Sequence, residues 1–477
     1  MKTQPTTEKT SVELTIREAT LSLKLQNWRA KLRAKAKQEK RSRFYSLYGL
    51  VSHPETLREA WAKVRANGGK SGVDGVSIEQ IEKEGEESFL EGLARELKEK
   101  TYRAGAVRRV YIPKANGKLR PLGIPTVRDR VVQAAVLLIL EPILEVDFLD
   151  CSFGFRPGRS AHQALETIRQ NLAAGRCTVS DADLEGYFDS IAHDQLLACV
   201  RMRVVDGSVL RLIEQWLNAV VEESDKEGRK HRRRNDKGTP QGGVISPLLA
   251  NIYLHYAFDQ WIHAWRKAPG RGCVIAIRYA DDSVVGFEKK ETAQQFLTQL
   301  RERLGKFCLS LHPDKTRLIE FGRFATERRR TRGDGQPETF DFLGFTHCCG
   351  QDRKGHFRVT RLTVKKRMRA TLSAIRETLL RRRHEPVPVV GTWLHRVVEG
   401  YFRYYAVPTN LFRLDGFRAE VCRAWRHALR RRSQRTRLNW DRFNRTVLQY
   451  IPRCRKLHPY PEERFLASHT LGKSRMR

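Results

Sequence analysis

Two adjacent aspartates, Asp281 and Asp282, stand between two apolar runs in the stretch VIAIRYADDSVVGF. The apolar flanks predict two short antiparallel strands joined at Ala280-Asp281. Each carboxylate raises the cost of ionising the other, so a buried hairpin would repel itself here without a cation. Because hard carboxylate oxygens suit Mg²⁺ or Mn²⁺, the pair predicts a divalent metal site. An ordinary turn or helix cap is the alternative for adjacent aspartates.

A further carboxylate for such a site comes from a second predicted strand, in TVSDADLEGYFDSI. Strand alternation places Asp181 and Asp183 on one face, and the aromatic pair Tyr187-Phe188 follows within one turn. Two metal ions held about 3.5–4 Å apart by carboxylates can activate a 3′-hydroxyl and stabilise a leaving pyrophosphate. Neither task requires a histidine base, so the pattern favours metal-assisted phosphoryl chemistry.

The charge balance points to a polyanionic partner. The 477 residues include 90 Lys plus Arg against 54 Asp plus Glu, giving a net charge of +36 and a pI near 10.2. Nucleic acid is the usual partner of so basic a chain, and a solubilising surface is the alternative. The length suggests about two to four domains.

Membrane, secretory and zinc-binding interpretations find little support in the sequence. The longest apolar run, VVQAAVLLIL at 131–140, is too short to span a bilayer and predicts a core helix, and the N-terminus lacks a secretory apolar stretch. Nine cysteines without a C-x-x-C pair suggest reduced thiols in a cytosolic compartment. The HCC sequence at 347–349 could ligate a metal, but no partner pair accompanies it.

The elements that would position the carboxylates alternate between strands and helices. VRRVYIPKANGKLRPLGIP, with its NG turn, predicts a hairpin that places Lys114 and Arg120 on either side of one turn. Helical patterns follow at 126–146, at 160–173 and near 192–221, so the middle of the chain is α plus β.

Both ends of the chain are basic and helical in pattern. After about residue 355, RLTVKKRMRATLSAIRETLLRRRH has apolar positions at helical spacing and basic residues elsewhere, so one face can pack while the other touches phosphate. These apolar positions are Leu362, Met368, Leu372, Ile375 and Leu379. EPVPVV at 385–390 breaks that helix, and WRHALRRRSQRTRLNWDRFNR interleaves arginines with aromatics, as in surfaces that pair phosphate contacts with stacking.

Together these motifs resemble the reverse transcriptase/maturases encoded by bacterial group II introns. The matching blocks keep the family's order across roughly residues 65 to 465: IPKANGKLRPLGIPTVRDRVVQ, SFGFRPGRSAHQAL, DADLEGYFDSI, GTPQGGVISPLLANIYL, YADD, LHPDKT, FDFLGF and GYFRYYAVPTN. YADD alone would be weak evidence, but the ordered set is specific. The chain lacks the paired cysteines and histidines of the C-terminal HNH endonuclease that many members carry, so we expect no second-strand cleavage.

The resemblance implies roles for individual residues. Asp183, Asp281 and Asp282 would bind two catalytic Mg²⁺ ions, with Mn²⁺ as a possible substitute, and Asp181 would support them. The remaining assignments concern the substrates. Lys114 and Arg120 would hold the incoming triphosphate, Phe188 would exclude a 2′-hydroxyl, Gln241 would contact the nascent base pair or sugar, and Gly242 and Gly243 would admit the template. Lys315 would protonate pyrophosphate or simply contact a phosphate.

Nucleic-acid contacts are expected from a second group of basic residues. Arg156 and Arg159 would contact template phosphate or brace the fingers. The exposed basic face of the later helices would supply further phosphate contacts, through Lys365, Lys366, Arg430, Arg431 and Arg432.

The implied fold is an α+β right-hand polymerase, with fingers and an antiparallel palm sheet followed by an all-α thumb. We expect a basic helical extension at 1–64, fingers and palm at 65–345, and a thumb/maturase region at 346–477 with a possible reduced DNA-binding tail. The expected function is RNA-directed DNA polymerisation with group II intron RNA as ribonucleoprotein partner, together with splicing assistance and retrohoming into target DNA, using a primer and dNTPs. We expect a cytoplasmic, nucleoid- or ribonucleoprotein-associated location without a membrane.

Two other functions stay open at this point. One is a splicing cofactor that binds RNA without polymerising, although intact YADD, DAD and TPQGG sequences argue against it. The other is a domesticated reverse transcriptase serving in repair, phage defence or CRISPR adaptation, which flanking intron sequence would distinguish.

Overall fold

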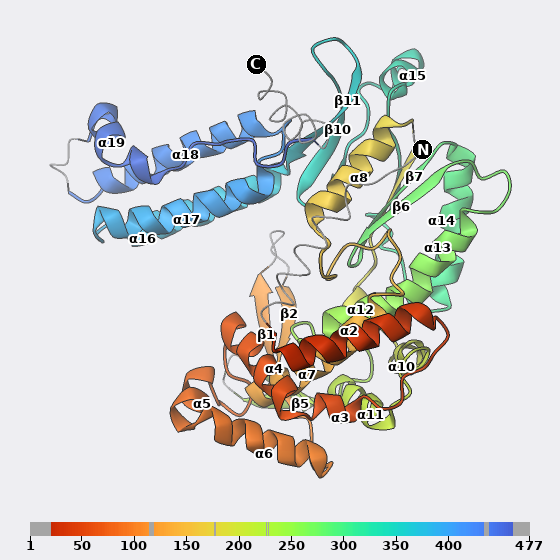
Figure 1. Ribbon diagram of the computed structural model, residues 1–477. Coiled ribbons are helices and arrows are strands. Elements are labelled where there is room, and N and C mark those ends of the chain that lie inside the picture. Colours follow the sequence, from red (N-terminus) through yellow and green to blue (C-terminus); the bar gives the residue numbers. More distant parts are fainter. Residues whose placement is uncertain are drawn as a thin grey trace, which may run out of the picture. The chain divides into compact units, whose positions relative to one another are not determined.

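The computed structural model describes residues 21–113, 119–175, 178–225, 227, 229–433 and 438–460 (Figure 1). The described residues divide into two compact units, one from the ranges 21–171 and 178–318 and one from the ranges 172–175 and 319–460. Helices and mixed sheets occur together, as expected for an α+β protein. None of the described helices is long and apolar enough to cross a membrane.

The first unit is built around α7 (Val127–Leu144), the helix expected from the long apolar run. Nearly all of its residues are buried, and Thr126 caps its first turn by accepting from the amide of Asp129. The N-terminal helix α2 (Leu23–Gln38) packs on α7, where buried Arg29 donates to Glu141 at 2.8 Å. The other helices of this layer are α3 (Tyr48–Val51), α4 (Pro54–Asn67), α5 (Ile78–Glu84) and α6 (Glu86–Lys98).

A four-stranded sheet contains the predicted hairpin, with strand order β2-β1-β4-β5. The strands are β1 (Val107–Pro113), β2 (Leu119–Ile124), β4 (Val221–Ser224) and β5 (Lys230–Arg233). β1 and β2 pair antiparallel from Arg108↔Ile124 to Pro113↔Leu119, which confirms the hairpin expected around the NG sequence. Lys114 and the turn itself lie outside the described residues.

The second sheet of this unit carries the predicted aspartates, and its strand order is β6-β7-β3-β8. Its strands are β6 (Val274–Tyr279), β7 (Asp282–Phe287), β3 (Thr178–Ala182) and β8 (Arg317–Glu320). Both neighbours of β7 run antiparallel to it. Helices pack on the sheet, so β7 is buried from Ser283 onward and forms a continuous apolar run.

Several helices complete the first unit, and they include those expected at 160–173 and near 192–221. They are α8 (Ala161–Ala173), α9 (Tyr187–Ser190), α10 (His193–Arg201), α11 (Gly207–Leu217), α12 (Ser246–Leu254), the π-helix η1 (His255–Asp259), α13 (Gln260–Trp265) and α14 (Lys290–Gly305).

The second unit contains a three-stranded sheet of order β11-β10-β9, formed by β9 (Phe340–Phe342), β10 (Phe345–Gln351) and β11 (Phe357–Thr363). The expectation that everything after 346 is helical is therefore wrong for β10 and β11. Leu362, which the helical spacing included, lies in β11. In this strand Val359, Arg361 and Thr363 alternate inward at period two, which is the pattern of a strand rather than a helix.

Helices make up the rest of the second unit: α15 (Ala325–Arg332), α16 (Lys365–Arg381), α17 (Val387–Tyr405), α18 (Leu411–Arg430), α19 (Trp440–Thr446) and the 3₁₀ turn η2 (Leu448–Tyr450). The expected break falls between α16 and α17, where Pro386 caps the new helix and Pro388 occupies its first turn. In Figure 1, α16 and α18 lie side by side, consistent with their packing against each other.

Candidate active site

The β6–β7 hairpin presents the aspartate pair. Tyr279 pairs with Asp282, so Ala280 and Asp281 form a two-residue connection as the sequence predicted. Two-residue hairpins require a positive φ at the first central position, and Ala280 has φ 57°. An alanine in this left-handed region costs roughly 1–2 kcal/mol, so the surrounding structure must hold the turn in place.

Asp183 reaches the same end of the sheet from β3. Ala182 of β3 pairs with Ser283 of β7, so the next step along the register brings Asp183 opposite Asp282. Asp181 lies two residues earlier, opposite Val284 and farther along the strand from the turn. Asp183, Asp281 and Asp282 therefore lie at the same end of the paired strands β3 and β7.

The electrostatics of Asp281 link it to Asp183. Asp281 is half-buried and Asp282 is exposed. Burial raises the pKa of Asp281 above its ordinary value, and the negative charge of Asp183 raises it further. The positive charges of Arg120 and Arg278 act in the opposite direction and lower that pKa. A divalent cation bound at this end of the strands would offset the repulsion between the carboxylates.

Lys315 contacts Asp183 directly. Its Nζ lies 2.5 Å from Oδ2 of Asp183, and its side chain remains 59% exposed. The oxygen donors fit a hard cation such as Mg²⁺, which prefers carboxylates. Among the described residues, however, no three His, Cys, Asp or Glu side chains are already gathered tightly enough to hold an ion. In this structure one of the candidate carboxylates, Asp183, is paired with Lys315 instead.

Phe188 lies just beyond Asp183, on α9. Tyr187 beside it is buried and donates its hydroxyl to the Ala250 carbonyl at 2.5 Å. The Phe188 ring packs edge-to-face on Tyr187, with ring centroids 5.3 Å apart. Phe188 is half-buried, and its carbonyl accepts from the amide of Thr239 at 2.7 Å. Packing against Tyr187 thus holds the Phe188 ring while the residue stays partly exposed.

Arg120 on β2 is linked to the TPQGG loop. Its Nε donates to Oε1 of Gln241 at 3.1 Å, and Gln241 in turn donates to Oδ2 of Asp189 at 3.4 Å. At Gly242, φ is 123° and an added Cβ would lie 2.5 Å from the Gly123 carbonyl oxygen. This close approach between the loop and β2 requires glycine, whatever contact the loop makes with a template.

The two arginines expected at the template behave differently from each other. Arg156 is buried, and its guanidinium binds the Glu145 carboxylate and the carbonyls of Phe148, Leu149 and Ser152. Because its guanidinium is enclosed by these partners, the expected direct contact with template phosphate is wrong, and bracing of the fingers stays a prediction. Arg159 is half-buried, and its Nη2 lies 2.5 Å from Oδ1 of Asp150.

The basic residues expected on the later helices belong to the second unit. Lys365 and Lys366 are exposed at the start of α16, and Arg430 and Arg431 are exposed at the end of α18. Arg432 is half-buried and donates to the Glu385 carbonyl at 2.6 Å, so part of this run fixes the backbone.

The HCC sequence lies on β10. His347 is buried and its ring stacks on Phe340, with centroids 4.6 Å apart and planes at 5°. Burial, together with the neighbouring charge of Arg361, lowers the pKa of His347 to about 3. The Cys349 thiol lies beside the backbone of Gly322.

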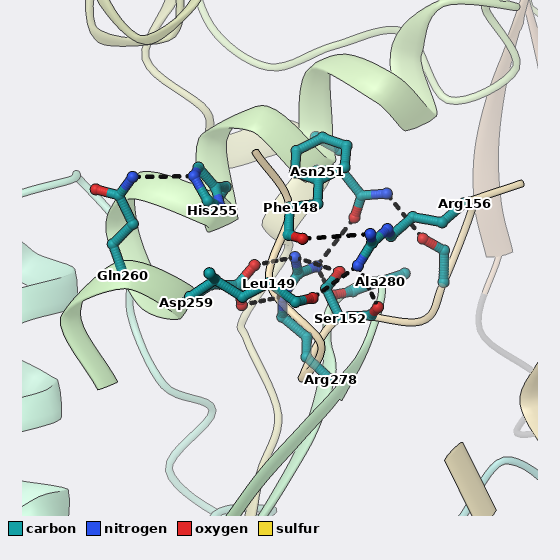
Figure 2. A network of polar contacts seen from close by, with 12 residues as sticks. Phe148, Leu149, Ser152, Arg156, Asn251, His255, Asp259, Gln260, Arg278 and Ala280 are labelled. Carbon is teal, nitrogen blue, oxygen red and sulfur yellow. Dashed lines mark hydrogen bonds and ion pairs between the residues drawn. The ribbon is translucent and has the colours of Figure 1, made fainter. Parts of the chain in front are cut away.

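Sequence reasoning missed the group that lies beneath the aspartate turn. Arg278 is buried within β6, where it pairs with Asp259 of η1 (Figure 2). A charged residue inside the apolar run VIAIRY was the available signal, because a buried charge requires a partner.

Comparison with known proteins agrees with this geometry. The family described as reverse transcriptase (RNA-dependent DNA polymerase) matches residues 112–347. Protein YkfC of Escherichia coli (strain K12) is 36% identical over 311 residues, which cover 58% of this chain and 80% of YkfC. Group II intron-encoded protein LtrA of Lactococcus lactis subsp. cremoris is 40% identical over 220 residues, which cover 44% of this chain and 34% of LtrA.

More distant similarity extends the same pattern. The nuclear intron maturase 2, mitochondrial, of Arabidopsis thaliana is 29% identical over 232 residues, which cover 41% of this chain and 30% of that protein. The ordered motifs, the family match and the extent of the similarity to YkfC lead to one assignment. The chain belongs to the reverse transcriptase/maturase family of group II introns, and its reverse transcriptase domain is that of an RNA-directed DNA polymerase.

Proposed function

We propose that this protein copies group II intron RNA into DNA by extending a primer with dNTPs at Asp183, Asp281 and Asp282. The observation that carries the proposal is the strand register that brings Asp183 opposite Asp282, next to the β6–β7 turn. The mutual repulsion seen at Asp281 is the property expected of a site that holds divalent cations. Members of this family generally use divalent ions such as Mg²⁺.

Two Mg²⁺ ions bound by these carboxylates would supply activation of the primer 3′-hydroxyl and stabilisation of the leaving pyrophosphate. Arg120, an exposed cation whose charge reaches Asp281, would orient the triphosphate. Its hydrogen bond to Gln241 would link triphosphate binding to the TPQGG loop, which would contact the nascent base pair. The Phe188 ring would stand where a ribose 2′-hydroxyl would clash.

Lys315 would change partner during the reaction. In the structure its ammonium neutralises Asp183. With cations on the carboxylates, the same ammonium would be free to hold a phosphate oxygen of the leaving pyrophosphate, and to donate a proton to it. A long, exposed lysine side chain has the reach and rotamer freedom for such an exchange.

The RNA partner would be the intron itself. The surplus of basic residues, with exposed cations on α16 and α18, supports binding to structured RNA. Family membership supports splicing assistance, reverse transcription at a DNA target during retrohoming, and the division into fingers, palm and thumb.

Primer extension tests the polymerase proposal. On poly(rA)/oligo(dT) with Mg²⁺, we expect Asp281→Ala and Asp282→Ala to abolish extension while RNA affinity in a filter-binding assay stays close to wild type. Asp194→Ala, which removes an exposed carboxylate from the first turn of α10, serves as the matched control and should extend normally. Retained extension by both catalytic variants would contradict the metal assignment.

Splicing assays test the intron proposal independently. A precursor RNA carrying the intron that flanks the gene should splice faster at low Mg²⁺ when the protein is added, and Asp281→Ala should preserve this effect. If no intron flanks the gene, or if the protein does not accelerate splicing, the maturase role is contradicted. The polymerase proposal would then stand without it.

A further inference from the structure

Arg278 uses every hydrogen-bond donor that it has. Its Nε and Nη2 donate to the two carboxylate oxygens of Asp259, at 2.7 and 2.6 Å. The other Nη2 hydrogen goes to Ser152 Oγ at 2.7 Å, and Nη1 donates to Asn251 Oδ1 at 3.0 Å and to the Ala280 carbonyl at 2.9 Å. An arginine side chain has five N–H groups, so none is left over. Figure 2 shows these partners arranged around the guanidinium.

The bond to Ala280 acts on the catalytic turn itself. The Ala280 carbonyl belongs to the peptide group whose nitrogen is that of Asp281, so fixing this oxygen fixes the peptide plane that leads into Asp281. Ala280 also holds the positive φ of 57°, a conformation that needs support from its surroundings. Arg278 is thus placed two residues before the turn it supports, within the same hairpin.

A second chain segment, residues 151–154, packs against the same hairpin. The Phe153 amide donates to the Arg278 carbonyl at 2.8 Å, and the Arg278 amide donates to the Cys151 carbonyl at 2.7 Å. A Cβ added at Gly154 would lie 2.4 Å from the Ala280 nitrogen, so only glycine lets this segment approach so closely. Asn251 binds both parts, because it accepts from Arg278 and donates to the Gly154 carbonyl at 2.7 Å.

Burial makes this arrangement rigid and electrically neutral. Arg278 is 1% exposed and Asp259 is 0% exposed, so both charges depend on each other for solvation. Lysine in place of Arg278 would keep the charge but would offer three donors from a single point, which cannot reproduce the planar fork. The geometry therefore demands arginine rather than any cation.

We infer that Arg278, held by Asp259 and Asn251, is a positioning residue that sets the peptide plane of Asp281 and thereby the placement of the Asp281 and Asp282 carboxylates. The inference rests on the proposed function of those carboxylates as the ligands of the catalytic ions. Arg278 itself contacts neither substrate nor reacting atoms.

The variant Arg278→Lys tests the inference. We expect the maximal rate of primer extension to fall about 100-fold, the effect typical of a misplacement of about 1 Å, with little change in KM for primer–template. The Mg²⁺ concentration giving half-maximal rate should rise several-fold. Without any metal or substrate, hydrogen exchange of the amides at 279–283 should become faster, a readout that does not depend on activity.

Arg203→Lys is the matched control for a buried arginine in the same unit. Arg203 is also buried, pairs with Asp147 at 2.9 Å and donates to the carbonyls of Ala36, Glu39, Lys40 and Ser42. We expect both lysine variants to lower Tm by several degrees. Only Arg278→Lys should raise the Mg²⁺ requirement and expose the 279–283 amides. Equal effects of the two variants on both readouts would reduce Arg278 to a stabilising residue and overturn the inference.

Asn251→Ala keeps the test decisive if Arg278→Lys does not fold. This substitution leaves the Arg278–Asp259 pair intact but removes one of the two acceptors of Nη1 and the link to Gly154. We expect the same changes at lower amplitude, and wild-type exchange with a wild-type Mg²⁺ requirement would contradict the inference. If the Asp281→Ala and Asp282→Ala variants still polymerise, the proposed function fails instead, while the exchange data continue to report on the turn.

Discussion

Arginine serves opposite purposes in two regions of this protein. Beneath the β6–β7 turn, Arg278 and Arg156 are buried, and their guanidinium groups bind carboxylates and backbone carbonyls. At the end of α18, Arg430 and Arg431 are exposed to solvent. Arg29, Arg130 and Arg203 are also buried and donate to backbone carbonyls, and Arg361 is buried as well.

The difference limits what a net charge can tell about binding. A surplus of +36 suggests many phosphate contacts, but an arginine enclosed by its own protein contributes to folding and not to RNA affinity. Stability and RNA binding should therefore respond to different arginines. The following predictions test that separation, from the largest expected effect to the smallest.

The largest effect should come from removing a buried guanidinium. Arg156→Ala leaves the Glu145 carboxylate partly buried without its partner, and we expect a loss of about 3–5 kcal/mol in the free energy of unfolding. Burial already raises the pKa of Glu145, and the charge of Arg156 lowers it. Without Arg156 the folded pKa should rise further, so urea unfolding should show the loss diminishing as the pH falls and Glu145 is protonated.

The salt dependence of RNA affinity separates this prediction from a phosphate-binding role. After unfolding is corrected for, Arg156→Ala should keep the wild-type slope of log K against log salt concentration. A shallower slope would mean that Arg156 contacts the nucleic acid. It would contradict the separation between buried arginines that stabilise the fold and exposed arginines that bind RNA.

A buried arginine also acts on its titratable neighbour in the second unit. Burial and the charge of Arg361 hold the pKa of His347 at about 3, below its ordinary value of 6.5. The unfolded chain then binds more protons between these values, so stability is full above about pH 6.5 and decreases as the pH falls toward 3. At pH 5 the expected cost is about 2 kcal/mol.

His347→Phe provides the measurement. Phenylalanine keeps a ring against Phe340 but cannot be protonated. We expect the difference in unfolding free energy between wild type and variant to change in favour of the variant as the pH is lowered from 7 to 5. A difference that is independent of pH would mean that His347 is accessible to protons in the folded state.

The exposed arginines of α18 should affect RNA binding instead of stability. Arg430→Ala with Arg431→Ala should lower RNA affinity and reduce the salt slope by roughly one for each phosphate that the variant no longer binds. The unfolding free energy should change by no more than about 0.5 kcal/mol. The neighbouring Arg432→Ala is a matched control, because its guanidinium binds the Glu385 carbonyl. It should reduce stability and leave the slope unchanged.

The sequence predicted where the three candidate carboxylates lie but not which residues support them. Asp183, Asp281 and Asp282 could be predicted because strand alternation and the adjacent apolar runs fix their positions, and the β1–β2 hairpin followed from its turn residues. Arg278 could not be assigned a role, because its partner Asp259 lies on a helix whose packing against β6 has no local signal. The strands within 345–363 were missed for a related reason, since apolar residues from Leu362 onward fit helical spacing and concealed a period of two.

Arg159 lies between the two classes, and its substitution should have the smallest effect. Its guanidinium is half-buried over the Phe153 ring, but its partner Asp150 has a side chain that is 96% exposed. Such a pair contributes about 0.2–1 kcal/mol to stability, so Arg159→Ala should barely change urea unfolding. Because solvent screens Asp150, a template phosphate could replace it as partner of Arg159.

The two partners of this pair should therefore have opposite effects on RNA binding. Arg159→Ala should weaken affinity about two-fold, and Asp150→Asn should strengthen it by a similar factor, since the competing carboxylate is removed. Filter binding at low salt gives both values. If Asp150→Asn leaves affinity unchanged while Arg159→Ala lowers the unfolding free energy by several kcal/mol, Arg159 belongs with the buried arginines that fold the protein.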